Sequence, residues 1–178
     1  MQEFLIVVDM QGDFIDGALG TEEAKAIVTR VQDKIEHFRG RVIFTRDTHG
    51  TDYLQTREGR HLPVPHCIRG TEGWSIDARL PVSGAFAVID KPAFGSVELG
   101  EQLRKENGRE RISRITLVGL CTDICVISNA LLARAFVPEA EIVVDASCCA
   151  GVTPESHRTA LRAMEGCQIR IEEGKQEG

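Results

Sequence analysis

The stretch that decides the fold is ITLVGLCTDICV, residues 115–126. Its first half is a continuous apolar run, which is typical of a strand that is covered on both faces. Its second half leads directly into a helical segment that ends before Pro138. Because a strand followed at once by a helix is the repeating unit of α/β folds, this stretch predicts a parallel sheet.

Similar apolar runs recur along the chain, namely FLIVVD (4–9), RVIFTRD (41–47), AFAVIDK (85–91), EIVVDA (141–146) and QIRI (168–171). Helical signals separate them: 22–38 after Thr21, 97–107 between Ser96 and Gly108, and a segment that starts at Thr153-Pro154. The alternation predicts a three-layer α/β/α sandwich around a six-stranded, mainly parallel, doubly wound sheet.

Length and composition favour one globular domain. The chain has 178 residues, of which 42% are hydrophobic, and its net charge is −6. We therefore expect a single domain over 1–178, with a frayed tail at about 172–178. One Trp, one Tyr and the absence of a basic run argue against a nucleic-acid partner.

The targeting and cysteine signals favour a cytoplasmic protein. The first apolar run is short and follows no basic segment, so it does not resemble a signal peptide, and no run is long enough to span a membrane. Without an export signal, the six cysteines are interpreted as free thiols rather than as disulfides.

Chemically capable side chains follow consecutive strands of the predicted sheet. Asp9 ends the first strand, Asp47 and His49 follow the second, Lys91 ends the third, and 121–125 follows the fourth. Parallel strands place their carboxyl ends at one edge of the sheet, where ligands bind. The segment from Asp47 to about Trp74 has no clear period, and a loop of that length is usually functional.

Cys125 is the candidate nucleophile. It lies near the N-terminus of a predicted helix, where unpaired N–H groups and the helix dipole favour a thiolate. The alternative is a small buried packing residue, which is the usual role of a free cysteine. Cys121 is the rival thiol, and Asp123 is expected to cap the helix. The remaining cysteines are interpreted as packing residues, with a smaller chance that Cys148 or Cys149 lines the pocket: Cys67, Cys148, Cys149 and Cys167.

The chain resembles the isochorismatase-like cysteine hydrolases, and most closely their nicotinamidase branch. The resemblance rests on motifs that occur in the family's order: VDMQGDF (8–14), TRDTH (45–49), PHCIRGTEGW (65–74), IDKPAFGS (89–96) and GLCTDICV (119–126). Together they cover nearly the whole chain. A single motif would be moderately specific, whereas the ordered set is strong evidence.

The resemblance implies a catalytic triad of Asp9, Lys91 and Cys125. It also implies a cis peptide between Leu120 and Cys121, with the N–H groups of Cys121 and Cys125 as an oxyanion hole. In that chemistry the carboxylate takes the thiol proton, the ammonium stabilises the thiolate, and the thiol forms a thioester. The alternative for Asp9 and Lys91 is a plain buried ion pair.

Asp47, His49 and His66 are the candidate metal ligands. Oxygen and imidazole ligands suit a divalent ion, with zinc first and manganese or iron as alternatives. His61 is a further candidate, since the extra histidine of the branch is missing.

The expected substrate contacts are Phe14, Phe94 and Leu120, with Tyr53 as an alternative. Pro63 occupies a position where nicotinamidases commonly carry Trp, so part of their aromatic wall is absent.

The first functional hypothesis is a hydrolase of non-peptide linear amide C–N bonds, such as nicotinamide to nicotinate and ammonia. The second is a metal-free isochorismatase or carbamoyl-amide hydrolase. A third, of another class, is a redox or thiol-sensing protein with a Cys121–Cys125 disulfide. A fourth, an inactive binding module, is disfavoured by the intact triad. The resemblance also implies a homo-oligomer, a dimer or larger.

Overall fold

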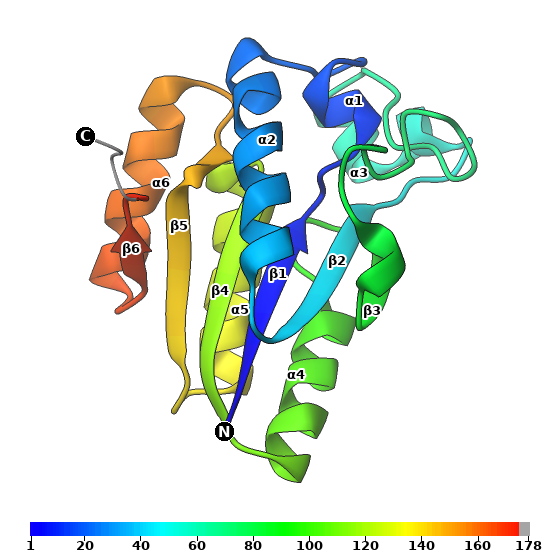
Figure 1. The fold of residues 1–178 in the computed structure, drawn as a ribbon. Coiled ribbons are helices and arrows are strands. Elements are labelled where there is room, and N and C mark those ends of the chain that lie inside the picture. Colours follow the sequence, from blue (N-terminus) through cyan, green and yellow to red (C-terminus); the bar gives the residue numbers. More distant parts are fainter. Residues whose placement is uncertain (175–178) are drawn as a thin grey trace.

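The structure is a computed structural model, and it describes residues 1–174. Its centre is a six-stranded sheet in the order β3-β2-β1-β4-β5-β6, with every neighbouring pair parallel (Figure 1). The strands are β1 Gln2–Val8, β2 Arg41–Asp47, β3 Ala87–Lys91, β4 Ile112–Leu120, β5 Glu141–Ala150 and β6 Arg170–Glu172. The predicted doubly wound sheet is thus confirmed, and it is wholly parallel.

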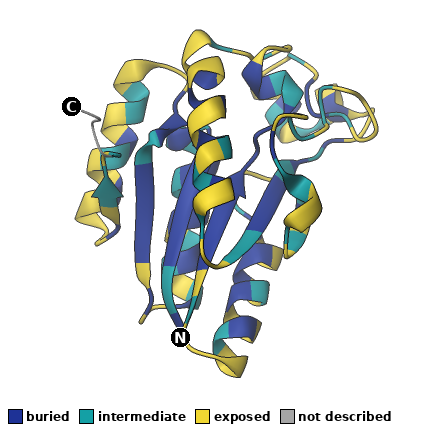
Figure 2. Ribbon diagram, viewed as in Figure 1, coloured by how far each residue is buried: buried dark blue, intermediate teal, exposed yellow. Residues whose placement is uncertain are grey.

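Helices cover both faces of this sheet, which gives three layers (Figure 1). They are α1 Gly12–Ile15, α2 Glu22–His37, α3 Arg57–His61, α4 Val97–Arg109, α5 Ile127–Phe136 and α6 Pro154–Gly166. The central strand β1 is buried on both sides (Figure 2). Its Phe4 and Ile6 pack toward α4, α5 and α6, whereas Leu5 and Val7 pack toward α2. Because successive side chains of a strand point to opposite faces of the sheet, β1 contributes alternate residues to the apolar core on each side.

Three predicted helix starts are confirmed by capping side chains: Thr21, Ser96 and Thr153 accept hydrogen bonds from the first turns of α2, α4 and α6. The predicted stop at Gly108 is wrong. The helix α4 continues through Arg109 and ends where Glu110 becomes extended, because a glycine near a helix end costs only about 1 kcal/mol.

The last strand is shorter than predicted, since Gln168 has a positive φ of 62° and β6 starts at Arg170. Glu172, predicted to belong to the frayed tail at 172–178, is instead the final residue of β6. The rest of that predicted tail lies largely outside the described residues, which end at 174.

The strand order reverses between β1 and β4, and this switch point fixes where a ligand can bind. At the carboxyl end of β4, Gly119 pairs with Val8 and has a φ of +116°. A Cβ atom on Gly119 would lie 2.1 Å from the carbonyl oxygen of Val8. Only glycine therefore lets β4 approach β1 this closely at the switch point.

The long segment after β2 is more ordered than the sequence suggests, because it contains α3 and is held by the α1 region. The side-chain amide of Gln11 donates to the carbonyl oxygens of Asp47 and Trp74, at 2.9 and 2.8 Å. The carboxylate of Asp13 accepts the N–H of Cys67 at 2.7 Å. Residues from the motif at 8–14 thus fix both ends of this segment over the sheet.

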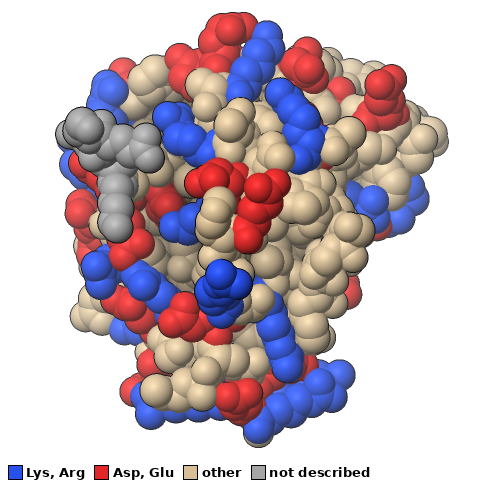
Figure 3. All heavy atoms as spheres, in the orientation of Figure 1, with Lys and Arg blue, Asp and Glu red and all other residues tan. Residues whose placement is uncertain are grey.

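On the surface, acidic and basic side chains are interspersed over the face shown in Figure 3. Within residues 1–174, no helix combines the length and the apolar character that a membrane crossing requires.

We predict that Gly119→Ala lowers the free energy of unfolding by at least about 2 kcal/mol, because the added methyl group meets backbone at a positive φ. Urea unfolding followed by circular dichroism measures the change. Gly108→Ala is the matched control, since a Cβ there meets no atom within 4 Å, and it should stabilise α4 by about 0.5 kcal/mol. Equal effects of the two substitutions would contradict this account.

Candidate active site

A fully buried lysine lies at the centre of the site. Lys91 ends β3, and its Nζ lies 2.6 Å from Oδ2 of Asp9 and 3.4 Å from Sγ of Cys125. The same ammonium contacts Oδ1 of Asp47 at 3.3 Å and donates to the carbonyl of Ala93 at 3.1 Å. The structure therefore brings the three predicted triad residues together, with one cation facing two carboxylates and a thiol.

Asp9 is positioned by the turn that follows β1. Its φ is +47°, in the left-handed region that Asp tolerates better than most residues. Its Oδ1 accepts the hydroxyl of Thr45 at 2.6 Å, and its side chain is completely buried. Burial raises the pKa of Asp9, against the lowering effect of Lys91. A carboxyl group held in this way is suited to accept and return a proton.

The resting state of the nucleophile differs from the sequence-based expectation. The helix dipole at Cys125 predicted a thiolate, but burial and the negative charge of Asp9 raise the pKa of this thiol well above its usual value, despite Lys91. Cys125 is only 4% exposed, so little water can reach its side chain to stabilise an anion. Burial therefore opposes the thiolate that the helix dipole favours.

The turn that carries the nucleophile is one short π-helical segment, Thr122–Val126. The Leu120–Cys121 peptide is cis, as the resemblance implies. Asp123 does not cap the helix, because Cys121 occupies that position and the Asp123 carboxylate instead accepts the N–H of Val152 at 3.0 Å. The turn is thereby tied to the loop after β5.

Two contacts that support this turn escaped the sequence analysis. Asn129 is fully buried, and its amide donates to the carbonyls of Cys125 and Phe94 at 2.8 and 3.1 Å and accepts the N–H of Ser96 at 2.9 Å. On the other side of the turn, Nδ1 of His157 lies 2.8 Å from Oγ1 of Thr122. An asparagine inside an apolar helix is unfavourable by propensity, and this was the one available signal.

Four side chains form a candidate metal site beside the thiol. The predicted ligands Asp47, His49 and His66 converge, and Glu58 of α3 joins them, with all four ligand atoms within 4.8 Å of one another. Nε2 of His49 lies 2.9 Å from Asp47 and 3.6 Å from Glu58. Glu58 was missed, because only the fold of α3 brings it to the histidines. The predicted alternative, His61, is exposed and lies outside this cluster.

Neighbouring hydrogen bonds and charges favour the binding of a cation by His66 and Glu58. Nδ1 of His66 lies 2.8 Å from the carbonyl of Val64, so this nitrogen carries the proton and Nε2 is left free to bind. Burial and the charge of Asp47 raise the pKa of Glu58, as expected where two carboxylates share a site that would be stabilised by a positive ion. Tyr53 packs against both histidines and is not among the residues that line the pocket beside them. The donor set and its supports therefore fit a divalent metal ion.

A pocket of about 310 Å³ opens above the thiol and the metal cluster. The expected substrate contacts Phe14, Phe94 and Leu120 all line it, as do Cys121 and Cys125. The wall is otherwise mainly apolar, with Leu19, Ala24, Leu62, Ile124 and Val152. One pocket thus brings together Cys125, three members of the cluster (Asp47, Glu58 and His66) and the three predicted contacts.

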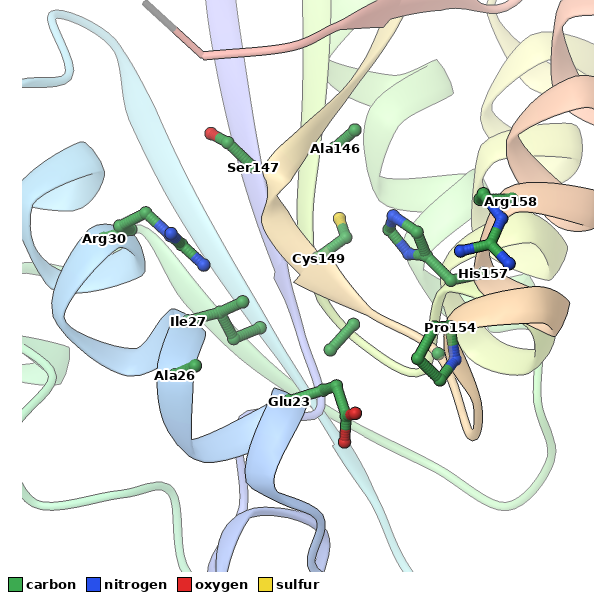
Figure 4. Close-up of a pocket in the computed structure, with 12 residues that line it drawn as sticks. Glu23, Ala26, Ile27, Arg30, Ala146, Ser147, Cys149, Pro154, His157 and Arg158 are labelled. Carbon is green, nitrogen blue, oxygen red and sulfur yellow. The ribbon is translucent and has the colours of Figure 1, made fainter. Parts of the chain in front are cut away.

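A second hollow lies beyond the loop after β5 (Figure 4). Cys149 and His157 both line it, whereas neither lines the pocket above Cys125. Cys148 is buried beside Ser147. Neither of these two thiols is therefore at the candidate active site, in agreement with a packing role.

Comparison with known proteins identifies the class. The isochorismatase domain model matches residues 3–174, and the chain belongs to this family. The nicotinamidase/pyrazinamidase of Mycobacterium tuberculosis is 28% identical, over 94% of this chain and 96% of that protein. The crystal structure of Pyrococcus horikoshii pyrazinamidase in complex with zinc has a TM-score of 0.82 and 31% identity, covering 96% and 98% of the two chains. The crystal structure of Bacillus subtilis nicotinamidase/pyrazinamidase has a TM-score of 0.80 and 30% sequence identity, and the match covers 97% of this chain and 100% of that chain.

We predict that Lys91→Met lowers the free energy of unfolding by about 3 kcal/mol, because it leaves two buried carboxylates without their cation. Adding Asp9→Asn should recover part of that loss, so a double-mutant cycle from urea unfolding shows strong coupling. The control is Arg79→Ala, which removes the exposed pair with Asp77 and should cost no more than about 1 kcal/mol. Additive effects of the Lys91 and Asp9 changes would refute the coupling.

We also predict that Glu58→Ala weakens zinc binding by at least about tenfold, since it removes one of four converging ligands. His61→Ala tests the alternative ligand, and it should bind zinc as the wild type does. Competition titration with a chromophoric chelator, supported by metal analysis of the purified proteins, measures both. If His61→Ala is the variant that loses zinc, the assignment of Glu58 is wrong.

Proposed function

We propose that this protein is a cysteine hydrolase that cleaves the C–N bond of a small amide, with nicotinamide as the reference substrate and nicotinate and ammonia as products. The observation that carries the proposal is the buried contact of Lys91 with Asp9 and Cys125, at 2.6 and 3.4 Å, beneath a pocket. The similarity to nicotinamidases supports the choice of an amide.

The reaction begins with a neutral thiol. As the amide carbonyl arrives, Asp9 takes the proton from Sγ of Cys125, and the sulfur bonds to the carbonyl carbon. The tetrahedral adduct then expels the amine, which takes the proton from Asp9 and leaves as ammonia. The remaining thioester is hydrolysed by a water whose proton returns through Asp9 to the thiol. Atoms and protons balance over the cycle.

Lys91 and the turn at 121–125 stabilise two different negative charges, the thiolate and the oxyanion of the adduct. The ammonium faces both the carboxylate and the sulfur, so it stabilises the anion that exists while the proton is on Asp9. The N–H groups of Cys121 and Cys125 serve as donors to the oxyanion of the adduct, an interaction typically worth ~10²–10³ in rate for each donor. Asn129 and His157 hold this turn and act as positioning residues.

Zinc is the metal we assign to the cluster of Asp47, His49, Glu58 and His66, because imidazole and carboxylate ligands suit it and a similar structure was solved with zinc. When bound, such an ion supplies a Lewis-acidic position for a neutral donor atom of the substrate or for a water. The protein's own part is to place three of these ligands, Asp47, Glu58 and His66, on the same pocket that contains Cys125.

The charge of the pocket favours a neutral substrate. Among the described residues, no Lys or Arg lines it, and its acidic side chains, Asp47 and Glu58, belong to the metal cluster. A carboxylate of an isochorismate-like substrate would be buried there without a protein cation, which is costly. A carboxamide on a neutral aromatic ring meets no such penalty. The metal-free isochorismatase alternative is therefore disfavoured.

The thiol-sensing hypothesis is also disfavoured. Redox-sensing cysteines are accessible and have low pKa values. Here burial and Asp123 raise the pKa of Cys121 to about 12, and burial raises that of Cys125 as well. The homo-oligomer and the cytoplasmic location implied by the sequence remain predictions.

We predict that the purified, zinc-loaded protein releases ammonia from nicotinamide and that Cys125→Ala lowers kcat by at least about 10³-fold, because the covalent route is lost. A coupled ammonia assay measures this. Cys149→Ala is the matched control: it also removes a buried thiol, but from the second hollow, and it should retain activity. The proposal fails if nicotinamide and related small amides all yield no ammonia.

A further inference from the structure

The pocket is larger and more apolar than a bare pyridine ring requires. Its volume of about 310 Å³ reaches the lower end of the range for pockets that bury drug-sized ligands, ~300–1,000 Å³. The thiol and the metal cluster occupy its floor. A single-ring amide whose carbonyl reaches Cys125 therefore leaves the outer part of the pocket empty.

The outer part is rimmed by apolar side chains that are exposed to solvent. Leu62, Phe94 and Val152 all line the pocket and are 39%, 44% and 51% exposed. They come from three separate segments: the end of α3, the loop after β3 and the loop after β5. Apolar side chains gathered at the mouth of a concave site mark a surface that a ligand covers.

The polar side chains that line the outer part of the pocket place few requirements on a ligand. The hydroxyl of Thr21 already accepts the N–H of Ala24 at 3.0 Å, and His61 is exposed. No Lys or Arg within the described part of the chain lines the pocket, so the rim offers no lysine or arginine cation to an anionic substituent. A neutral apolar group is the occupant that gains most from burial here.

We propose that the preferred substrate is an aromatic carboxamide that bears an apolar substituent, an alkyl group or a second ring, which lies between Leu62, Phe94 and Val152. This inference rests on the proposed amidase function. The carboxamide reacts on the floor at Cys125, and the substituent projects from a ring carbon meta or para to it, the positions farthest from the reacting carbonyl. The three rim residues then determine specificity rather than chemistry.

The test compares nicotinamide with derivatives that carry methyl, ethyl or phenyl groups meta or para to the carboxamide. Each buried carbon should raise kcat/KM about fourfold, so the best ethyl derivative, with two added carbons, should exceed nicotinamide by about sixteenfold. Calorimetric titration of the Cys125→Ala protein with the same compounds provides a readout that does not depend on turnover. Affinity should rise in the same order.

Leu62→Ala and Leu131→Ala form a matched pair, since the two leucines are 39% and 40% exposed but only Leu62 lines the pocket. Leu62→Ala should reduce the preference for the ethyl derivative over nicotinamide by at least about threefold. Leu131→Ala should leave the preference unchanged. A preference that persists in Leu62→Ala would exclude the rim as its cause.

The possible results distinguish a failure of this inference from a failure of the proposed amidase function. If nicotinamide is hydrolysed but every substituent lowers both kcat/KM and affinity, the extended substrate is ruled out and the amidase function stands. If no compound of the series is hydrolysed, yet affinity for Cys125→Ala rises with the substituent, the apolar subsite stands and the amidase proposal fails. If neither turnover nor affinity follows the substituent, the inference is overturned.

Discussion

The structure depends on one buried ammonium. Lys91 is inaccessible to solvent, and its Nζ contacts Asp9, Asp47 and the sulfur of Cys125 within 3.4 Å. Without this cation, two carboxylates and a potential thiolate would lie together in a medium of low dielectric constant, an arrangement that is strongly destabilising. The same contact holds Asp9, Lys91 and Cys125 in one place, so the reactivity proposed for them and the stability of the fold depend on a single interaction.

Pairing of parallel strands explains why these groups meet. In the sheet register, Asp47 at the end of β2 is the direct partner of Lys91 at the end of β3. The next strand in the sheet, β1, is followed by Asp9, and β4 by the turn that contains Cys125. Because the strand order reverses between β1 and β4, the helices that follow them, α2 and α5, lie on opposite faces of the sheet, and a crevice opens at the carboxyl ends of the two strands. The strand order therefore determines where the pocket lies, and the side chains at the strand ends supply its reactive groups.

The metal cluster and the triad are joined through Asp47, which contacts both Lys91 and the histidines. A cation at the cluster would compensate the carboxylates on one side while Lys91 compensates them on the other. Gln11 fixes the backbone at Asp47 on both sides, accepting its N–H and donating to its carbonyl. These hydrogen bonds of Gln11 help to order the start of the long segment after β2.

The sequence by itself determined the layers and the parallel sheet, because apolar runs are local features of the chain, and it predicted that Asp9, Lys91 and Cys125 would meet at one edge of that sheet. It also identified Asp47, His49 and His66. Only the tertiary structure decided that Glu58 rather than His61 completes the cluster, that Asn129 and His157 support the turn, and that burial raises the pKa of the Cys125 thiol. These outcomes depend on burial and on contacts between distant segments, and neither quantity exists until the chain has folded.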